Sequence, residues 1–262
     1  MSFGLIVIGD EILSGKRQDK HFAQVLALLT ARGLPLAWAM VLGDDRERLT
    51  AVLRRSFAAG EKVISCGGIG ATPDDHTRQA AAAALGVELA PHPEAVALIS
   101  ERCREMAAQG RGSADMTLPE NQQRLKMGEF PLGSRIIPNP YNKIPGFAVA
   151  DHWFVPGFPV MAWPMVEWVL DHHYSDLHHR EQWIDRSVIL HDVAESAVVP
   201  LMEAIEKTFP MVKAYSLPSM GENGLGRHIE LGLKAPAQQI EPAFAMLEQG
   251  VAELEAQRSG GR

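Results

Sequence analysis

The chain has 262 residues, of which 46% are hydrophobic and 22% are charged, and its formal net charge is −7. This composition is typical of a globular protein with one or two domains, and the negative charge argues against a nucleic-acid partner. No apolar run approaches the length of a membrane span and the first residues lack a signal-peptide pattern, so we expect a cytoplasmic protein with no membrane partner. The two cysteines, Cys66 and Cys103, exclude a disulfide framework and a cysteine metal site.

Strands and helices alternate over the first part of the chain. The predicted strands are apolar runs at residues 3–8, 34–42 and 63–66, and the predicted helices cover residues 22–29, 49–59 and 79–85. The second helix begins at Asp44 or Asp45 and ends at Gly60. Strands and helices at this spacing predict βαβ units and a mainly parallel sheet, whose ligands lie at the carboxyl ends of the strands.

The loop after the third strand has the densest run of glycines. Gly67, Gly68 and Gly70 allow the backbone to approach a ligand closely. We expect Thr72 to cap the following helix, because threonine accepts hydrogen bonds from the first N–H groups of a helix. Free N–H groups at such a helix start bind anions, and phosphate is the expected anion. The loop contains no lysine, so it is not a phosphate loop of the Walker type.

Two acidic residues, Asp74 and Asp75, stand where a phosphate would bind, and their charges would repel it. Three interpretations stay open. In the first, Thr72 and Asp75 form a capping box and have a structural role only. In the second, a divalent cation, typically Mg²⁺, bridges the carboxylates and the phosphate oxygens. In the third, one carboxylate accepts hydrogen bonds from the amine edge of a heterocycle.

The middle of the chain is harder to interpret. Residues 110–146 are rich in glycine and proline, and apart from a short strand they predict a long binding loop. Five clearer elements lie around and within it: a helix at 93–106, strands at 135–137, 147–149 and 153–155, and a helix at 160–170. Residues 171–181 contain four histidines, which we interpret as a solvated helix end and linker rather than a metal site.

The pattern then changes to a βαββα order, which predicts a small α+β domain with both helices on one face of its sheet. Its strands are residues 183–190, 211–217 and 227–233, and its helices are residues 194–208 and 236–256. The glycine-rich segment 221–226 predicts a hairpin connection. We therefore expect a first domain over residues 1–173, a linker over 174–181 and a second domain over 182–262.

Residues 9–15, Gly-Asp-Glu-Ile-Leu-Ser-Gly, and the glycine loop at 67–77 together resemble the molybdopterin-binding domain of the MoaB/Mog type. The closer of the two resemblances is to the N-terminal region of competence/damage-inducible protein A, over residues 3–165, and the remainder resembles the small KH-like domain that follows it. The resemblance implies a three-layer α/β/α sandwich that binds a phosphorylated pterin or a nucleotide diphosphate, in a homo-oligomer. In this branch of the family it also implies metal-dependent hydrolysis of a nucleotide diphosphate such as ADP-ribose.

The resemblance also implies roles for individual residues. The implied phosphate- and ligand-binding residues are Ser14, Gly67, Gly68, Gly70, Thr72 and Thr77, with Pro156 and Gly157 closing the far wall. The implied catalytic residues, which orient water or hold metal, are Asp10, Glu11, Asp74 and Asp75. The implied ligands of Mg²⁺ or another divalent cation are Asp10, Asp74 and Asp75. Molybdopterin is the alternative bound cofactor.

Two segments depart from the family. Residues 142–146 are Asn-Lys-Ile-Pro-Gly where the family tends to have Gly-Thr-Ala-Pro-Gly, and residues 156–162 lack the glutamate of Pro-Gly-x-Pro-x-Glu-Met. Lys143 therefore brings a cation to the ligand side, and we predict that it binds the anionic end of the ligand. Three functions stay open: a metal-dependent pyrophosphatase, a non-catalytic binding protein for molybdopterin or a related phosphorylated ligand, and a sensor or scaffold that kept the fold and lost the chemistry.

Overall fold

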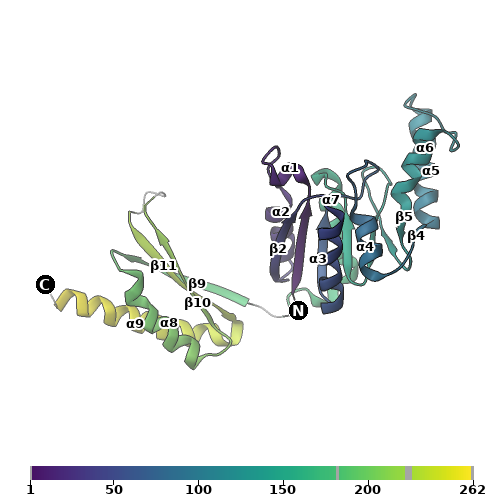
Figure 1. Cartoon of the computed structure of the whole chain (residues 1–262). Helices are drawn as coiled ribbons and strands as arrows, with labels where there is room; N and C mark the ends of the chain where they lie inside the picture. The colour runs from purple at the N-terminus through teal and green to yellow at the C-terminus, as the bar shows by residue number, and fades with distance from the viewer. Residues whose placement is uncertain (1, 181–182, 222–225, 261–262) are drawn as a thin grey trace. The chain divides into compact units, whose positions relative to one another are not determined.

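The computed structural model divides into two compact units, Met1–His178 and His179–Arg262 (Figure 1). The structure describes residues 2–180, 183–221 and 226–260, the last four by their backbone alone. Tyr174 is 5% exposed in the core of the first unit, and its hydroxyl accepts a hydrogen bond from Trp153 Nε1 at 2.7 Å. The first unit thus continues past residue 173. The predicted linker at 174–181 stays a prediction, and its last residue lies outside the described residues.

The first unit contains a six-stranded sheet in the order β2-β1-β3-β8-β7-β6. Its strands are β1 (Phe3–Ile8), β2 (Leu36–Leu42), β3 (Lys62–Cys66), β6 (Arg135–Ile137), β7 (Gly146–Val149) and β8 (His152–Val155). β1 pairs in parallel with β2 and β3, and β3 pairs in parallel with β8, whereas β7 is antiparallel to both of its neighbours. The prediction of a mainly parallel sheet is confirmed.

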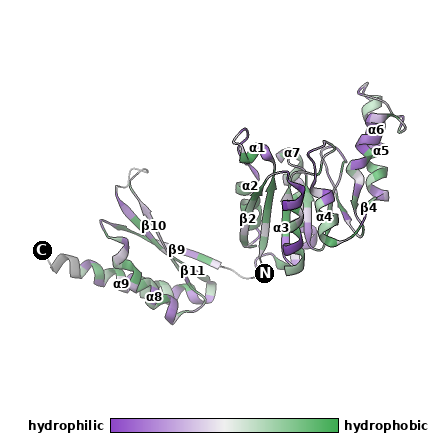
Figure 2. Cartoon of the chain, viewed as in Figure 1, coloured by the Kyte–Doolittle hydropathy of each residue, from purple (hydrophilic) through white to green (hydrophobic). Residues whose placement is uncertain are grey.

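Helices cover both faces of this sheet. On one face lie α2 (His21–Thr30) and α7 (Pro159–His173), and on the other lie α3 (Arg46–Ala59) and α4 (Thr77–Leu85). The helix α5 (Pro93–Ala108) contributes Ala95 to the core on this second face and otherwise extends away from the sheet. The strand β1 is buried along its whole length because alternate side chains enter the two cores, and Figure 2 shows its hydrophobic colour between the helices. The predicted three-layer α/β/α sandwich is confirmed.

Residues 110–146 are less irregular than the sequence predicts. They contain α6 (Pro119–Leu125), the 3₁₀ helix η1 (Lys126–Gly128) and β5 (Glu129–Pro131), in addition to β6. β5 pairs with the short strand β4 (Leu89–Pro91), which lies far from it in the sequence. Elements of three to seven residues carry too little periodicity to be predicted locally, so the prediction of one long loop is wrong in this part. A further short helix, α1 (Asp10–Leu13), follows β1.

The start of α4 also differs from the prediction. The helix begins at Thr77 after His76, which forms no side-chain cap. The N–H and hydroxyl of Thr72 donate to Asp75 Oδ2 at 2.9 and 2.5 Å, and the N–H of Asp75 donates to the Thr72 carbonyl at 3.1 Å. Thr72 and Asp75 therefore close a turn ahead of the helix, and the prediction that Thr72 caps α4 is wrong.

The second unit has the predicted βαββα order. It consists of β9 (Trp183–His191), α8 (Glu195–Thr208), β10 (Lys213–Ser219), β11 (His228–Pro236) and α9 (Ala237–Gly260), with an antiparallel sheet in the order β10-β11-β9. Both helices pack on one face of the sheet around Leu231 and Leu233. Of the predicted hairpin connection, residues 222–225 lie outside the described residues. No helix in the described part of the chain combines the length and the apolar character needed to cross a membrane.

Candidate functional site

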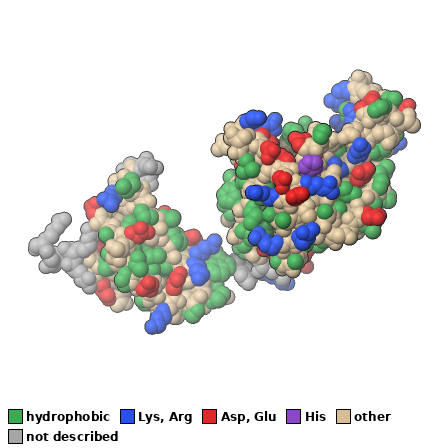
Figure 3. Space-filling view, in the orientation of Figure 1, with side chains coloured by type: hydrophobic (Ala, Val, Ile, Leu, Met, Phe, Trp, Pro, Cys, Tyr) green, Lys and Arg blue, Asp and Glu red, His purple; other side chains and the backbone are tan. Residues whose placement is uncertain are grey.

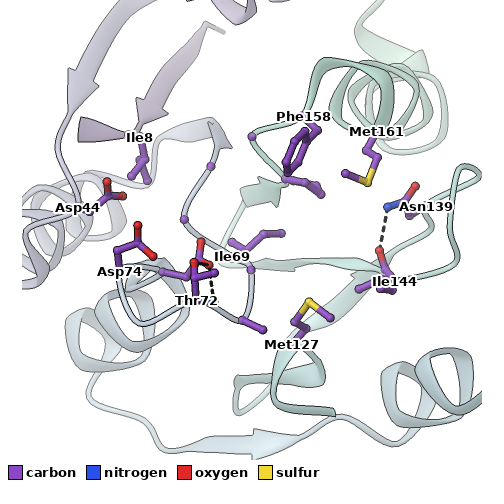
Figure 4. Close-up of a pocket in the computed structure, with 18 of the residues that line it drawn as sticks. Ile8, Asp44, Ile69, Thr72, Asp74, Met127, Asn139, Ile144, Phe158 and Met161 are labelled. Carbon is purple, nitrogen blue, oxygen red and sulfur yellow. Dashed lines mark hydrogen bonds between the residues drawn. The ribbon is translucent and has the colours of Figure 1, made fainter. Parts of the chain in front are cut away.

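A pocket of about 410 Å³ opens at the carboxyl ends of the parallel strands (Figure 4). One side is formed by the residues at and after the ends of β1, β2 and β3, and the other by the residues that follow β8, by Met127 of η1 and by the segment between β6 and β7. Figure 4 shows Ile8, Asp44 and Asp74 at one end and Asn139, Ile144 and Met161 at the other. Open α/β sheets bind their ligands at this edge, because the loops there converge while the strands hold them in place.

The glycine loop is packed so closely against its neighbours that side chains do not fit. A Cβ on Gly67 would lie 2.3 Å from the carbonyl oxygen of Ile8, and a Cβ on Gly68 would lie 2.2 Å from Thr77 Oγ1. Both glycines also have positive φ angles, of 110° and 68°. Glycine is required at these positions for its backbone conformation and for its lack of a side chain.

The carbonyl groups of the loop are held by the first turn of α4. Thr77 Oγ1 donates to the Gly67 carbonyl at 3.1 Å, and the N–H of Thr77 donates to the Gly68 carbonyl at 3.0 Å. Arg78 is 3% exposed, and its Nη2 donates to the Gly70 carbonyl at 2.6 Å. Burial lowers the pKa of Arg78, although the charges of Glu129 and Asp75 act in the opposite direction.

Holding these carbonyls determines where the following N–H groups point. A trans peptide points its carbonyl and its N–H in opposite directions, and the described residues contain no cis peptide. The N–H groups of Gly68, Ile69 and Ala71 therefore point away from α4. Among the residues that the structure describes, none of these three groups donates a hydrogen bond, and all three residues line the pocket. Three open donors in one short loop can bind an anion.

Acidic side chains lie beside this loop, and Figure 3 shows several of them on the face of the first unit that carries α1. Asp10 and Asp44 are joined by reciprocal bonds. The N–H of Asp10 donates to Asp44 Oδ2 at 2.9 Å, and the N–H of Asp44 donates to Asp10 Oδ1 at 3.2 Å. Burial raises the pKa of Asp44, and the charges of Asp10, Glu11 and Asp74 raise it further.

The acids do not form a metal site of the predicted kind. Within the described part of the chain, no group of three or more His, Cys, Asp or Glu side chains is placed to hold a metal ion. Of the predicted Mg²⁺ ligands, Asp75 is engaged by Thr72, and Asp10 is engaged by Asp44 and lines a neighbouring cavity rather than this pocket. In the described structure these three residues are therefore not arranged around one Mg²⁺ position.

The structure gathers most of the predicted site residues in one place. The predicted residues that line the pocket are Glu11, Gly67, Gly68, Gly70, Thr72, Asp74, Asp75, Pro156 and Gly157. Asp10 and Ser14 line the neighbouring cavity, together with Asp44 and Asp74. Thr77 is buried behind the glycine loop and acts on its backbone rather than on the pocket surface.

Lys143 lies elsewhere. Its Nζ donates to Glu101 Oε1 at 2.7 Å and also to Glu105, both on α5, and these bonds raise the pKa of the lysine. The residue lines a different cavity, next to Trp168. Because two carboxylates draw the ammonium group to α5, the geometry does not support the predicted role of Lys143 at the phosphate.

The sequence analysis missed several lining residues. These are Arg17, Asp44, Met127, Asn139, Asn142, Ile144, Phe158 and Met161. Asn142, Ile144 and Met161 lie in the two segments that depart from the family pattern, residues 142–146 and 156–162. That departure is a sequence signal that these segments form a pocket wall different from that of the family. Met127 lies in the segment that the sequence left without an assignment, and no local signal marks it.

The first unit is a domain of the α/β/α class, and the open N–H donors of its glycine loop lie at the edge of the sheet where such domains bind ligands. Residues 4–175 match the family model described as a probable molybdopterin binding domain, and the chain belongs to this family. The family that the motifs at residues 9–15 and 67–77 predict is thereby confirmed.

Individual relatives extend this comparison. The chain is 29% identical over 259 residues to a CinA-like protein of Koribacter versatilis, which covers 96% of this chain and 59% of the relative. It is 31% identical over 242 residues to Protein Ta0487 of Thermoplasma acidophilum, with coverages of 90% and 84%. A crystal structure of the protein CinA from Thermoplasma acidophilum superposes with a TM-score of 0.55 at 26% identity, over 65% of this chain and 98% of that one. The chain spans between 37% and 59% of the length of several CinA-like relatives.

Proposed function

We propose that the first unit binds a phosphorylated pterin of the molybdopterin class, with its phosphate on the glycine loop, and that it does so without catalysing a reaction. The observation that carries this proposal is the set of open N–H groups on Gly68, Ile69 and Ala71. The family match to a probable molybdopterin binding domain supports the pterin as ligand class.

The chain's own groups account for phosphate binding. Thr77 and Arg78 fix the loop before the ligand arrives, so the N–H donors need no rearrangement to meet an anion. Arg17 adds a cation to the pocket lining. On the opposite side, a Cβ on Gly157 would lie 3.4 Å from the Cα of Gly67, so the two loops approach closely and enclose the phosphate end. Hydrogen bonds to an ionised acceptor are about twice as strong as neutral ones.

Calorimetric titration tests the proposal with two matched compounds, 6-hydroxymethylpterin diphosphate and 6-hydroxymethylpterin. We expect the diphosphate to bind with a stoichiometry of one per chain, and the alcohol to bind much more weakly because the N–H groups then have no anionic partner. Chromatography after long incubation should recover the diphosphate unchanged. Equal affinities for the two compounds, or no binding of the diphosphate, would overturn the proposal.

Metal-dependent hydrolysis of a nucleotide diphosphate such as ADP-ribose is the second candidate. The observation that favours it is that four acidic residues line one cavity beside the glycine loop, because a cation there would relieve their mutual repulsion. These residues are Asp10, Glu11, Asp44 and Asp74. The candidate ranks second because the described acids form no metal site.

One experiment separates the two candidates. ADP-ribose is incubated with the wild type, Asp74→Asn and Asp75→Asn, with Mg²⁺ or with a chelator, and release of AMP is followed. Binding without hydrolysis, unaffected by the chelator, is expected from the first candidate. Mg²⁺-dependent release of AMP that Asp75→Asn abolishes would establish the second candidate in its place, because asparagine retains the size of the side chain and removes its charge.

Three broader proposals accompany this function. We propose that the protein is a homo-oligomer assembled through the first unit, that it acts in the cytoplasm, and that it has no nucleic-acid partner. The first rests on the family resemblance and the third on the net charge of −7. Light scattering at micromolar concentration tests the oligomer, and a monomer would contradict it.

A further inference from the structure

We infer that the end of the pocket remote from the glycine loop is a slot for a flat heteroaromatic ring, and that Asn142 recognises an acceptor atom on the edge of this ring. The inference rests on the proposed function, since it takes the pocket as the ligand site. It specifies which part of the ligand binds at this end of the pocket and which side chain recognises that part.

The walls of the slot are apolar and adaptable. Figure 4 shows Met161 and Phe158 on one side of the pocket and Met127 on the opposite side, with Ile144 at its end. Thioether side chains adjust to the shape of a ligand and make favourable contacts with aromatic rings. Phosphate alone would gain nothing from such walls, whereas a flat ring between the two methionines would bury apolar surface.

The amide of Asn142 is held in one orientation. Its Oδ1 accepts from the backbone N–H of Ile144 at 3.0 Å and from Asn139 Nδ2 at 2.9 Å. A backbone N–H can only donate, so the oxygen must face Ile144 and the Nδ2 group must point the other way. Asn139 is itself 5% exposed, and it also donates to the Ile144 carbonyl at 2.9 Å and accepts from the N–H of Tyr141.

The Nδ2 group of Asn142 retains donor capacity. Its acceptor among the described residues is Met161 Sδ at 3.3 Å, and a thioether is a weak acceptor. The donor therefore lies in a fixed position beside the walls that would hold a ring. A ring nitrogen or a ring carbonyl supplies the stronger acceptor that it lacks.

Two classes of compound present this chemistry, a phosphorylated pterin and a purine nucleoside diphosphate. In both, a flat ring with acceptor atoms on its edge is joined to phosphate by a short linker. The phosphate would meet the glycine loop while the ring enters the slot. The side chain of Lys143, next to Asn142, is held at α5 by Glu101 and Glu105 and leaves this position free of a competing charge.

The substitution Asn142→Asp isolates the donor. The carboxylate still accepts from Ile144 and Asn139, which holds the segment in place, but it has no N–H to offer a ring. The probes are 6-hydroxymethylpterin diphosphate, GDP and inorganic pyrophosphate, measured by calorimetry. Repulsion from the added charge also weakens the binding of pyrophosphate. The quantity compared between the wild type and the variant is therefore the affinity for each ring compound divided by the affinity for pyrophosphate.

We expect Asn142→Asp to lower this ratio by about tenfold or more for the ring compound that the slot accepts. Tyr141→Ala is the matched control, since Tyr141 is the neighbouring residue, is 61% exposed and does not line the pocket, and it should leave the ratio unchanged. Met161→Ala gives a second test that leaves Asn142 in place, and it should weaken ring binding while pyrophosphate binds as before.

The outcomes separate the inference from the proposed function. An unchanged ratio in Asn142→Asp and in Met161→Ala overturns the ring slot, while binding of pyrophosphate still supports the phosphate loop. If the wild type binds a ring compound through Asn142 but does not bind pyrophosphate, the slot stands and the phosphate assignment falls. Tighter binding of the pterin than of GDP, or the reverse, identifies the source of the ring.

Discussion

The two ends of the parallel sheet in the first unit differ in whether their polar groups are paired with one another. At the amino end, Ser56 Oγ lies 2.7 Å from His152 Nε2, and His152 Nδ1 lies 2.8 Å from the Ala150 carbonyl. These groups are paired with each other and sealed by aromatic side chains such as Phe57. At the carboxyl end, three carbonyls of the glycine loop are paired and the N–H groups that follow them are left open. This difference indicates that a ligand site is distinguished from a structural polar cluster by donors without an acceptor, and not by the presence of polar residues alone.

The largest effect is expected from Gly68→Ala at the carboxyl end. The new Cβ would lie 2.2 Å from Thr77 Oγ1, which is buried and cannot retreat, and the φ angle is 68°. Backbone strain and the steric clash together should lower the free energy of unfolding by about 4 kcal/mol. Pyrophosphate binding should be lost, because the loop must move.

Gly60→Ala is the matched control for this substitution. Gly60 has nearly the same φ angle, 65°, but a Cβ there meets nothing within 4 Å. It should show the strain alone, about 1 to 2 kcal/mol, and leave binding intact. Urea denaturation and calorimetry measure both quantities. Equal losses in the two variants would show that close packing of the loop is not what the site requires.

At the amino end, His152 should make stability depend on pH. Burial lowers the pKa of His152 to about 4, below the value of about 6.5 in an unfolded chain. The unfolded state therefore binds a proton as the pH falls below about 6.5 while the folded state does not, and stability is lost toward acid. The wild type should lose roughly 2 to 3 kcal/mol more than His152→Gln between about pH 7 and about pH 4.5.

Urea denaturation over this pH range measures the effect, with His172→Gln as the control because His172 is exposed. The control should retain the slope of the wild type. If His152→Gln retains it as well, the paired cluster at the amino end does not keep His152 neutral.

Asp44 should weaken phosphate binding at neutral pH, when its carboxylate is ionised. Asp44→Asn removes this charge and can still accept the hydrogen bond from Asp10, so pyrophosphate affinity should rise about two- to fivefold. Because the pKa of Asp44 is raised, the wild-type residue becomes neutral at a higher pH than an ordinary aspartate. The advantage of the variant should therefore shrink as the pH falls.

Asp45→Asn is the control, since Asp45 caps α3, does not line the pocket, and asparagine caps as well as aspartate. Calorimetry at several pH values provides the measurement. A decrease in affinity on Asp44→Asn would mean that the carboxylate helps to hold the ligand, as a metal-dependent site would require.

Lys143→Thr should have the smallest effect on phosphate binding. The lysine is paired with Glu101 and Glu105 outside the pocket, and its side chain is 39% exposed, so solvent screens the pairs. Pyrophosphate affinity should stay unchanged in calorimetry. A marked loss would restore the role at the phosphate that the sequence analysis predicted for this residue.

Much of the fold follows from local patterns in the sequence. The strand β1 is a continuous apolar run because both of its faces are buried, and the glycine loop stands out because Gly67 and Gly68 have no room for a side chain. The alternation of strands and helices then determines which edge of the sheet carries the ligand. Most of the pocket residues on this side of the site could therefore be predicted.

The rest depends on contacts that a local pattern does not contain. Thr72 and Asp75 form a hydrogen bond of the capping-box type, but this bond closes a turn as readily as it begins a helix. The direction of Lys143 is set by two glutamates on α5, distant in sequence. Met127 reaches the pocket because the segment that carries it is held by the pairing of β5 with β4.

The most direct test of the central claim is an NMR titration of the backbone amides with 6-hydroxymethylpterin diphosphate. If the open N–H groups bind the phosphate, the amide signals of Gly68, Ile69 and Ala71 should shift strongly. The amide of Gly60, which donates to the Phe57 carbonyl at the end of α3, should not shift. Binding of the ligand without a shift at the three loop amides would contradict the account, because the phosphate would then be held elsewhere.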